Sequence, residues 1–437
     1  MNAGVRLLAR VWRELGADPR RLERVRAPLA PLPLPSRLSV GDLAWSSVAA
    51  AALASGREPA DLDALDPARI ALAYRSDRVL RLDGRAPSVW SPYSAFWESA
   101  DGWIRTHGNY PHHAAALCAA LDLGRSAAPE EISRAVAAMR SGEAARRISA
   151  AGGLAVVVGG ERPALEEQLR ASPLIEVLRA DGSAGRPKPD PASGKPLNGI
   201  RVLDLTRVIA GPVATRTLAL LGADVLRIDP PHLPEPDWQH YDTGHGKRSA
   251  LLDARSDTMH ELLSVADIVV LGYRPAGLHR LGLDPEELIA RYPGLIALEL
   301  SAWGAEHADR RGFDSLVQAE SGIAMIESSD GIRPGALPAQ ALDHSAGYLL
   351  AAAAMILLER RRREGGSWLA RTSLRRIAAE LLGMPRTAQP ASVAEIDVAP
   401  HTATFMVAGR AVDTVRPVLP WHEFDAPRRF GGDQPRW

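Results

Sequence analysis

Residues 197–231 read LNGIRVLDLTRVIAGPVATRTLALLGADVLRIDPP, and this stretch decides the fold. The apolar run 200–205 predicts a buried strand, 214–221 predicts a helix, and 225–228 predicts a second strand. Gly222-Ala223-Asp224 makes the turn between that helix and the strand after it. Two short apolar strands joined by a helix are typical of neighbouring parallel strands in one sheet.

The same alternation continues to about residue 380. Further strands are predicted at 249–252, 268–271 and 295–300, and helices at 258–265 and 285–292. The pattern predicts an α/β fold with a Rossmann-like parallel sheet that is covered by helices on both faces. Ligands of such sheets bind at the carboxyl ends of the strands, so the turns after these strands are candidate binding positions.

The length of 437 residues predicts two or three domains. A segment rich in Pro, Gly and Ser, 180–196, predicts an exposed linker. It separates a smaller, mostly helical α+β domain (1–179) from the large domain (197–385), and residues 386–437 are expected to pack back on both. Helices in the first domain are predicted at 4–15, 41–55, 111–121, 129–140, 142–151 and 163–170, with strand-like pieces at 79–82 and 154–158.

Composition excludes several classes of protein. Lys+Arg and Asp+Glu are both 52, so a global basic field for nucleic acid is absent. The single cysteine, Cys118, excludes an intrachain disulfide framework and fits a reducing cytoplasm. The longest apolar run, 348–358, is too short to cross a bilayer, and arginines interrupt the N-terminal apolar residues. We therefore expect a cytoplasmic protein without a nucleic-acid or membrane partner.

The turn after the first strand bears on phosphate binding. Residues 207–212, RVIAGP, contain one glycine, whereas a dinucleotide site needs G-x-G-x-x-G, so NAD is rejected as the default ligand. Backbone N–H groups at the following helix N-terminus still suit an anion, and an ordinary tight turn is an equally good interpretation. Cations near strand ends favour a ligand with several phosphates, although each one alone is an unremarkable surface residue: Lys247, Arg248, Arg255, Arg274 and Arg280.

Further blocks follow in order along the chain: KRSALLDARS (247–256), ADIVVLGYRPAGLHRLGLDPEEL (266–288), YPGLIALELSAWG (292–304), RGFDSLVQAESG (311–322) and ALDHSAGYLLAAAAMILLERRRREG (341–365). Together with residues 197–231, this series of about 170 residues resembles the family III CoA-transferases of the CaiB/BaiF type. That group includes formyl-CoA transferase and the carnitine and bile-acid CoA-transferases. The resemblance implies that the protein moves coenzyme A between an acyl-CoA and a small carboxylic acid.

The resemblance also implies the site residues. The residue that matches the family's catalytic aspartate, which forms an anhydride and then a thioester, is Asp343. It implies coenzyme A or acyl-CoA as a substrate, with no permanently bound cofactor and no metal, and it is compatible with a homodimer. The positions that match the family's CoA contacts are Ile209, Ala210, Leu252, Asp253, Ala254, Arg255, Gly272, Tyr273, Arg274, Arg280, Ser301, Ala302, Trp303 and Gly304.

The chain departs from the family at several places. Leu271-Gly272-Tyr273 stands where Glu-Asn-Phe is usual, and a later Gly-rich loop that covers the family's active site has no obvious match. Residues 99–124 and 142–178 resemble the family's small domain, which normally follows the aspartate helix but here comes first. We interpret this order as a permuted or fused and trimmed arrangement.

Asp343 has two local interpretations. It sits just before an apolar helix, where a helix cap is the usual role and a nucleophile is also served by the helix dipole. Sequence context alone favours the cap, whereas the resemblance favours the nucleophile. His344 and Ser345 are expected to be ordinary residues of the first turn, and Asp314 to be structural.

Two rival functions stay open. The same fold serves 2-methylacyl-CoA racemases, which resemble this chain except that Phe313 replaces their proton-exchanging histidine. A non-catalytic acyl-CoA-binding subunit is the other rival, motivated by the missing loop and the rearranged small domain. His107, His112 and His113 lack the further ligands of a metal site, and we expect them to pack in a core or to line an acyl pocket with Trp103 and Tyr110.

Overall fold

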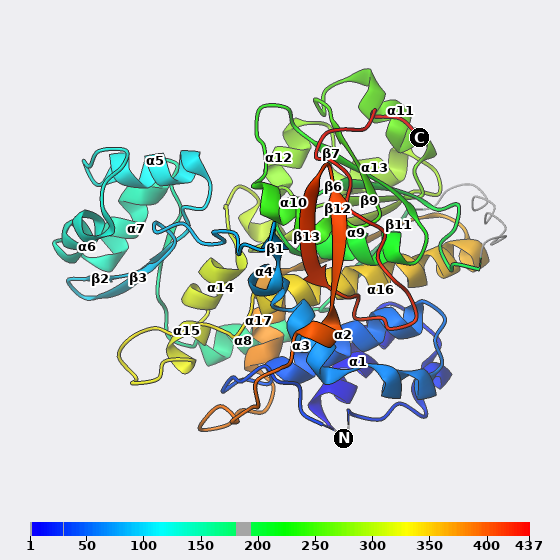
Figure 1. Cartoon of the computed structure of the whole chain (residues 1–437), viewed down its shortest axis with the longest axis horizontal. Helices are drawn as coiled ribbons and strands as arrows, with labels where there is room; N and C mark the ends of the chain where they lie inside the picture. The colour runs from blue at the N-terminus through cyan, green and yellow to red at the C-terminus, as the bar shows by residue number, and fades with distance from the viewer. Residues whose placement is uncertain (1, 29, 181–193) are drawn as a thin grey trace.

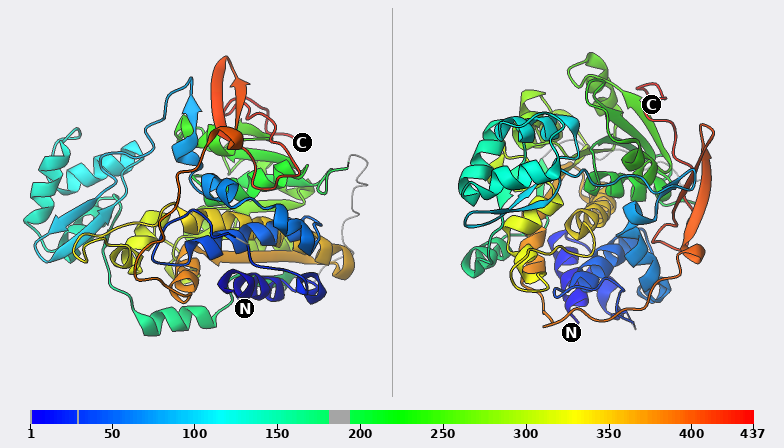
Figure 2. Two further views of the ribbon diagram at one scale, coloured as in Figure 1. Left: turned by 60° about the horizontal axis from the view of Figure 1, so that its bottom comes forward. Right: turned by 60° about the vertical axis from the view of Figure 1, so that its left-hand side comes forward.

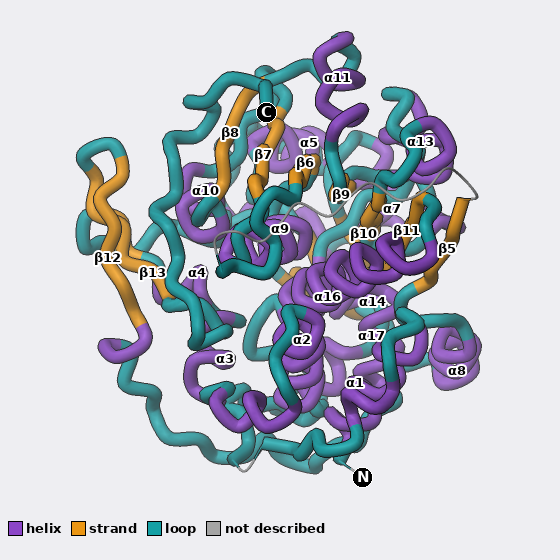
Figure 3. The backbone as a smooth tube through the Cα atoms, turned by 90° about the vertical axis from the view of Figure 1, so that its right-hand side faces the viewer, coloured by secondary structure: helices purple, strands orange, loops and turns teal. Residues whose placement is uncertain are grey.

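A seven-stranded sheet lies at the centre of the computed structural model, which describes residues 2–28, 30–180 and 194–437 (Figure 1). Its strand order is β5-β11-β10-β9-β6-β7-β8, which Figure 3 shows from one edge to the other. All neighbouring pairs are parallel except β5 and β11. The strands are β5 (Glu176–Ala180), β6 (Arg201–Leu205), β7 (Asp224–Asp229), β8 (Lys247–Leu251), β9 (Ile268–Leu271), β10 (Ile296–Ser301) and β11 (Ser367–Ser373).

Both faces of the sheet are buried, because successive side chains of a strand point to opposite sides. Val202 and Val270 pack in one core with α9 (Ala210–Leu220) and α16 (Ala341–Glu364). Leu203 and Val269 pack in a second core with α11 (Asp257–Val265) and α13 (Pro285–Arg291). The predicted α/β class is confirmed, and each of the five predicted strands lies within two residues of an observed one.

The long helix α16 is the central helix of the first core. It contacts α9 on one side and α2 (Val40–Ala54) on the other, and α1 (Ala3–Glu14) packs on α2. By length and composition α16 is able to cross a membrane, but 94% of its most apolar window is buried inside the protein. The neighbouring helices therefore account for its apolar composition.

The predicted N-terminal domain does not fold as one unit. Leu8, Trp45 and Tyr74 belong to the same core as α16, whereas residues 90–160 form a separate body that we call the small subdomain. It stands to one side of the large sheet in both views of Figure 2. Its elements are β2 (Phe96–Ser99), β3 (Gly102–Thr106), β4 (Ala155–Val157), α5 (Pro111–Ala120), α6 (Pro129–Ala137) and α7 (Ser141–Ala150).

The chain then returns to the body through α8 (Pro163–Ala171) and β5, which pairs with β11. The division at residue 179 is therefore wrong, because β5 needs a partner that comes about 190 residues later. Most of the predicted linker 180–196 lies outside the described residues. The remaining helices are α3 (Pro67–Ala73), α4 (Ser76–Val79), α10 (Asp237–Thr243), α12 (Pro275–Arg280), α14 (Asp314–Glu320), α15 (Ile323–Ile326) and α17 (Leu374–Leu382), with short 3₁₀ turns at Pro19–Leu22, Pro59–Ala64, Ala305–His307 and Ala399–His401.

The C-terminal segment runs along the outside of the large sheet. A hairpin of β12 (Thr402–Val407) and β13 (Arg410–Val415) pairs with the short strand β1 (Arg81–Leu82). The last residues then follow β8, where the N–H of Asp433 donates to the carbonyl oxygen of Ser249 over 2.8 Å. This segment covers the exposed edge of β8, a role that protects a sheet from unwanted pairing.

Candidate active site

Asp343 lies inside the first turn of α16, not before the helix as the sequence suggested. The helix begins at Ala341, and Gln340 is the residue at its cap position. The Asp343 side chain is buried, with 7% of the residue exposed. Among the described residues, its carboxylate accepts no hydrogen bond. The cap interpretation from local sequence context therefore does not hold, and Asp343 is a buried carboxylate without a donor among the described residues.

A second carboxylate, Asp314, meets the start of α16. Its Oδ2 accepts the N–H of Asp343 over 2.9 Å, and its Oδ1 accepts the Gln318 side-chain amide over 2.5 Å. Gln318 in turn accepts the N–H of Leu337 over 2.9 Å. Asp314 is fully buried at the first position of α14, immediately after Phe313. The sequence predicts a structural role for Asp314 and gives no sign of its contact with Asp343.

The charge of Asp314 perturbs the neighbouring carboxyl group of Asp343. Burial, followed by repulsion from Asp314, raises the pKa of Asp343 well above its ordinary value. Burial also raises the pKa of Asp314 to about 6, against the hydrogen bonds that it accepts. Strongly raised carboxyl pKa values are typical of functional sites, because a fold gains no stability from burying two like charges together.

The start of α9 lies directly beside α16. A Cβ added to Gly347, one turn after Asp343 on the same helix face, would lie 2.6 Å from the carbonyl oxygen of Ala210. Glycine at this position therefore lets the first turns of α9 and α16 touch. The N–H groups of the first turn of a helix have no partner within the helix, so α9 offers backbone donors next to the aspartate helix.

The turn that leads into α9 carries backbone strain. Val208 has a φ of 72°, in the left-handed region that a β-branched residue rarely adopts. Its N–H donates to the Glu235 carboxylate over 2.7 Å, which helps to hold this conformation. Strain of this kind is retained mainly where function requires a fixed backbone shape.

Most of the positions expected to contact coenzyme A lie at or just after the carboxyl ends of strands, on one edge of the sheet. Ile209 and Ala210 follow β6, residues 252–255 follow β8, 272–274 follow β9, and 301–304 follow β10. Arg280 ends α12, and it and Arg274 both point at Asp309, over 3.4 and 3.7 Å respectively. The parallel sheet thus brings the predicted residues to one edge, although residues 252–255 lie two strands away from β6.

The structure brings only some of the predicted cationic side chains to the carboxyl edge of the sheet. Lys247 and Arg248 lie at the amino end of β8, away from Arg255. Lys247 is buried and binds Asp204 over 3.1 Å, while Arg248 pairs with Asp224 over 2.8 Å. They are structural ion pairs because they stand at the wrong end of the strand for a ligand at its carboxyl edge.

A loop of the small subdomain covers the residues next to Asp314. The His107 ring stacks on Phe313 with centroids 3.9 Å apart, and Tyr110 and His113 also contact Phe313. The Nδ1 atoms of His107 and His113 are buried, and neither has a hydrogen-bond partner within the described part of the chain. Burial lowers the pKa of each to about 3, so both rings are neutral. These histidines were predicted to pack in a core or to line an acyl pocket, but no sequence pattern indicates their contact with Phe313, about 200 residues away.

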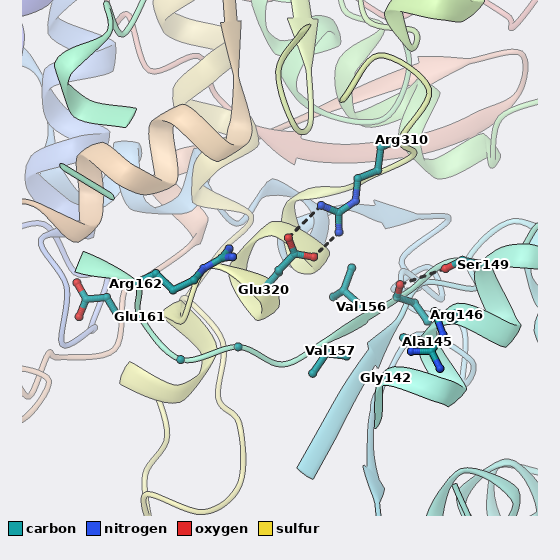
Figure 4. Close-up of a pocket in the computed structure, with 13 residues that line it drawn as sticks. Gly142, Ala145, Arg146, Ser149, Val156, Val157, Glu161, Arg162, Arg310 and Glu320 are labelled. Carbon is teal, nitrogen blue, oxygen red and sulfur yellow. Dashed lines mark hydrogen bonds and ion pairs between the residues drawn. The ribbon is translucent and has the colours of Figure 1, made fainter. Parts of the chain in front are cut away.

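A surface groove lies away from Asp343. It has a volume of about 700 Å³ and runs between the small subdomain and α14 (Figure 4). Arg310 and Glu320 form an ion pair in its wall, and the Arg310 guanidinium stacks on Trp303 with 3.7 Å to the ring centroid. Asp343 does not line this groove. Across the described ranges, no group of three or more His, Cys, Asp or Glu side chains is arranged to hold a metal ion.

The second half of the chain is similar to known proteins. Residues 197–402 match the model of CoA-transferase family III. The probable fatty acyl-CoA transferase Rv3272 of Mycobacterium tuberculosis is 35% identical over 184 residues, covering 38% of this chain and 46% of the relative. The succinyl-CoA:glutarate CoA-transferase of Mus musculus is 32% identical over 172 residues, covering 35% and 39%.

Among solved structures, a crystal structure of Rv3272 matches with a TM-score of 0.40 and 32% identity, covering 43% of this chain and 56% of that one. The chain thus spans less than half of the length of the curated relatives that it matches.

Proposed function

We propose, on the premise that residues 197–402 belong to CoA-transferase family III, that the protein transfers coenzyme A from an acyl-CoA to a carboxylic acid through Asp343. The observation that carries the proposal is the Asp343 carboxylate, which is buried, free of hydrogen bonds among the described residues, and beside the start of α9. A carboxylate without donors keeps its lone pairs available for attack.

The proposed chemistry begins with attack of Asp343 on the thioester carbonyl of the donor. This step forms a mixed anhydride and releases the CoA thiolate. The thiolate then attacks the aspartyl carbonyl, which forms an enzyme thioester and releases the donor acid. The acceptor carboxylate attacks that thioester, and the thiolate finally attacks the acceptor's acyl carbonyl. Asp343 is regenerated, so neither water nor an external energy source is needed.

Each tetrahedral intermediate carries a negative oxygen. We assign to it the N–H groups of Ala210 and Gly211, the first two residues of α9, because the N-terminus of a helix has donors without a partner inside the helix and stabilises anions. The strained turn at Val208 fixes where these groups lie. A donor of this type contributes about 3 kcal/mol to lowering an acyl-transfer barrier.

The coenzyme A part of the substrate is assigned to the turns at the carboxyl edge of β6, β8, β9 and β10. Arg274, Arg280 and Arg255 supply the charge for its phosphates, and each is at least partly exposed. Tyr273 offers a buried hydroxyl without a hydrogen-bond partner at the same edge. The identity of the transferred acids is not assigned.

The loop from His107 to Tyr110 is proposed to replace the family's Gly-rich cover. It comes from the small subdomain of the same chain and lies on Phe313. Reactive anhydrides and thioesters must be kept from water, which a cover achieves. Since only 7% of Asp343 is exposed, we expect this loop to move when a substrate enters.

The test is covalent trapping. The protein is incubated with acetyl-, succinyl- and long-chain acyl-CoA, treated with hydroxylamine or borohydride, and digested for mass spectrometry. We expect a hydroxamate or alcohol at Asp343, its loss in Asp343→Ala, and its retention in the control Asp330→Ala, since Asp330 lies in an exposed loop. If no acyl-CoA modifies Asp343 while coenzyme A still binds equally to wild type and Asp343→Ala, the protein is a binding subunit and the proposal is wrong.

The stacking of His107 on Phe313 supports a second candidate, an acyl-CoA isomerase. It places a neutral imidazole beside the position where racemases of this fold carry their histidine. In deuterated water, an isomerase incorporates deuterium at the α-carbon of 2-methylacyl-CoA, and His107→Ala abolishes that exchange. A transferase modifies Asp343 without such incorporation.

A further inference from the structure

The start of α16 is capped from outside its own segment. Gln340, at the cap position, makes no side-chain hydrogen bond to the first turn. Asp314 of α14 supplies the cap instead, because it accepts the N–H of Asp343 over 2.9 Å and also that of Leu342. Two of the four N–H groups that a helix start leaves unsatisfied are therefore taken by a residue 29 positions earlier.

This arrangement differs from an ordinary helix start in the same chain. At α13, Asp284 uses its own carboxylate to accept the N–H groups of Glu286 and Glu287 over 3.0 and 3.2 Å. An aspartate so engaged has fewer lone pairs to offer as a nucleophile. In α16 the capping bonds go to Asp314, and Asp343 keeps both of its carboxylate oxygens free of donors among the described residues.

Asp314 is itself held in place. Gln318, one turn later in α14, donates to it over 2.5 Å and is anchored by the N–H of Leu337 over 2.9 Å. Asp314 and Gln318 are both buried, so the three-residue chain from Leu337 to Asp314 is rigid. This arrangement has an energetic cost, because it places two carboxyl groups next to each other away from solvent.

We propose that Asp314 is a positioning residue for Asp343: it caps α16 in place of Asp343, which leaves the Asp343 carboxylate uncapped, correctly placed and close to a like charge. The inference rests on the proposed function, since it assigns a role toward the same nucleophile. Asp314 makes no contact with the transferred group in this scheme and acts only through Asp343.

Other titratable groups surround the first turns of α16. His344 and Tyr348 stand on α16 itself, Tyr74 follows α3, and Arg216 comes from α9. Burial lowers the pKa of His344 to about 3, so it stays neutral, and Tyr74 stays protonated because burial raises its pKa. The small subdomain adds neutral His107 and His113 against Phe313. The group whose charge perturbs Asp343 is Asp314.

The experiment measures the rate of adduct formation at Asp343 from pH 4 to pH 9 in wild type, Asp314→Asn and the control Asp284→Asn. Asparagine keeps an acceptor for the Asp343 N–H but removes the charge. We expect a lower plateau rate and an acid limb displaced to lower pH, so that the fraction of the plateau rate retained at pH 5 rises severalfold. Asp284→Asn, which alters a cap at a distant helix, should leave the limb in place.

The outcomes separate the two proposals. Absence of an adduct in wild type defeats the proposed function. An adduct in wild type combined with an unshifted acid limb in Asp314→Asn defeats the positioning role, whatever happens to the plateau. If Asp314→Asn does not fold, Gln318→Ala is used instead. Loss of the amide donor favours the protonated form of Asp314, so the acid limb of adduct formation should move in the same direction, by a smaller amount.

Discussion

Two buried carboxylates on either side of α9, Asp204 and Asp343, differ in their hydrogen-bond and ion-pair partners. Asp204, on β6, binds Lys247 over 3.1 Å, Thr215 over 2.6 Å and Thr206 over 2.5 Å. Asp343, on α16, has neither a cation nor a donor among the described residues. Both are almost completely removed from water, so burial penalises the charged form of each.

The balance of burial and partners decides which protonation state wins. Burial alone would raise the pKa of Asp204, but attraction to Lys247 and Arg227 outweighs it and holds that pKa below the ordinary value. At Asp343 repulsion from Asp314 adds to burial, so the pKa rises. The fold thus gives the ionised Asp204 carboxylate its partners but makes ionisation of Asp343 unfavourable. Such a cost is typical of a residue that is retained for catalysis and not for stability.

Removing the cation from the satisfied site should have the largest effect. In Lys247→Met, Asp204 becomes an unpaired buried charge, and the free energy of unfolding should fall by about 3–5 kcal/mol in urea denaturation at pH 7.5. Arg248→Met is the control, because its partner Asp224 is largely exposed and such pairs contribute about 0–1 kcal/mol. A loss of under about 1 kcal/mol in Lys247→Met would show that the ion pair does not offset burial.

A smaller loss should follow from removing one donor of the same site. The Thr215 hydroxyl donates to Asp204, and Lys247 donates to that hydroxyl over 2.6 Å, so Thr215→Val should cost about 1.5–3 kcal/mol. Thr217, also buried in α9, donates only to the carbonyl oxygen of Val213. Thr217→Val is thus a matched control that should cost less, and equal losses would mean that the charged partner adds nothing.

Much of the sheet was predictable from sequence. Residues 268–271, Ile-Val-Val-Leu, are apolar and bounded by turns, so their strand was placed correctly. Residues 367–373, Ser-Trp-Leu-Ala-Arg-Thr-Ser, form β11 but are mixed in polarity, and they become a strand because β10 and β5 flank them. Local pattern gives no sign of such tertiary pairing, which is also why the division at residue 179 failed.

The candidate site shows the same limit. The resemblance of the surrounding blocks to the family predicts both Asp343 as the nucleophile and the positions that contact coenzyme A. The hydrogen bond from Asp343 to Asp314 spans 29 residues, and the stack of His107 on Phe313 spans about 200. Contacts of this range depend on how α14, α16 and the small subdomain pack together, which periodicity within each segment does not specify.

The smallest effect, and the one with the opposite sign, is expected at the unsatisfied site. Asp343→Asn removes one of two adjacent buried carboxylates, so the free energy of unfolding at pH 7.5 should rise by on the order of 1 kcal/mol. Activity should be lost at the same time. Urea denaturation of both proteins measures the difference.

The pH dependence provides a sharper form of this prediction. Asp314 has a folded pKa of about 6, above its unfolded value near 4, so between these values the folded state holds more protons. The contribution of protonated Asp314 to the free energy of unfolding is therefore fully present below about pH 4 and is lost as the pH rises through 6. In the wild type Asp314 already ionises beside a neutral Asp343, so Asp343→Asn should leave the decline through pH 6 in place. It should remove the further decline at higher pH that comes from ionisation of Asp343, whose pKa burial and repulsion from Asp314 raise well above its ordinary value.

Glu299, on β10, is the control for the change of stability with pH. Burial raises its pKa to about 7, and Asp314 is not among the groups that perturb it. Glu299→Gln should flatten the decline at higher pH, and the two changes should add in the double variant because distant sites act independently. If Asp343→Asn instead lowers stability at every pH with an unchanged slope, Asp343 is a stabilising residue like Asp204. Asp343 and Asp204 would then not differ in their effect on stability. The argument that Asp343 is retained for catalysis would be wrong.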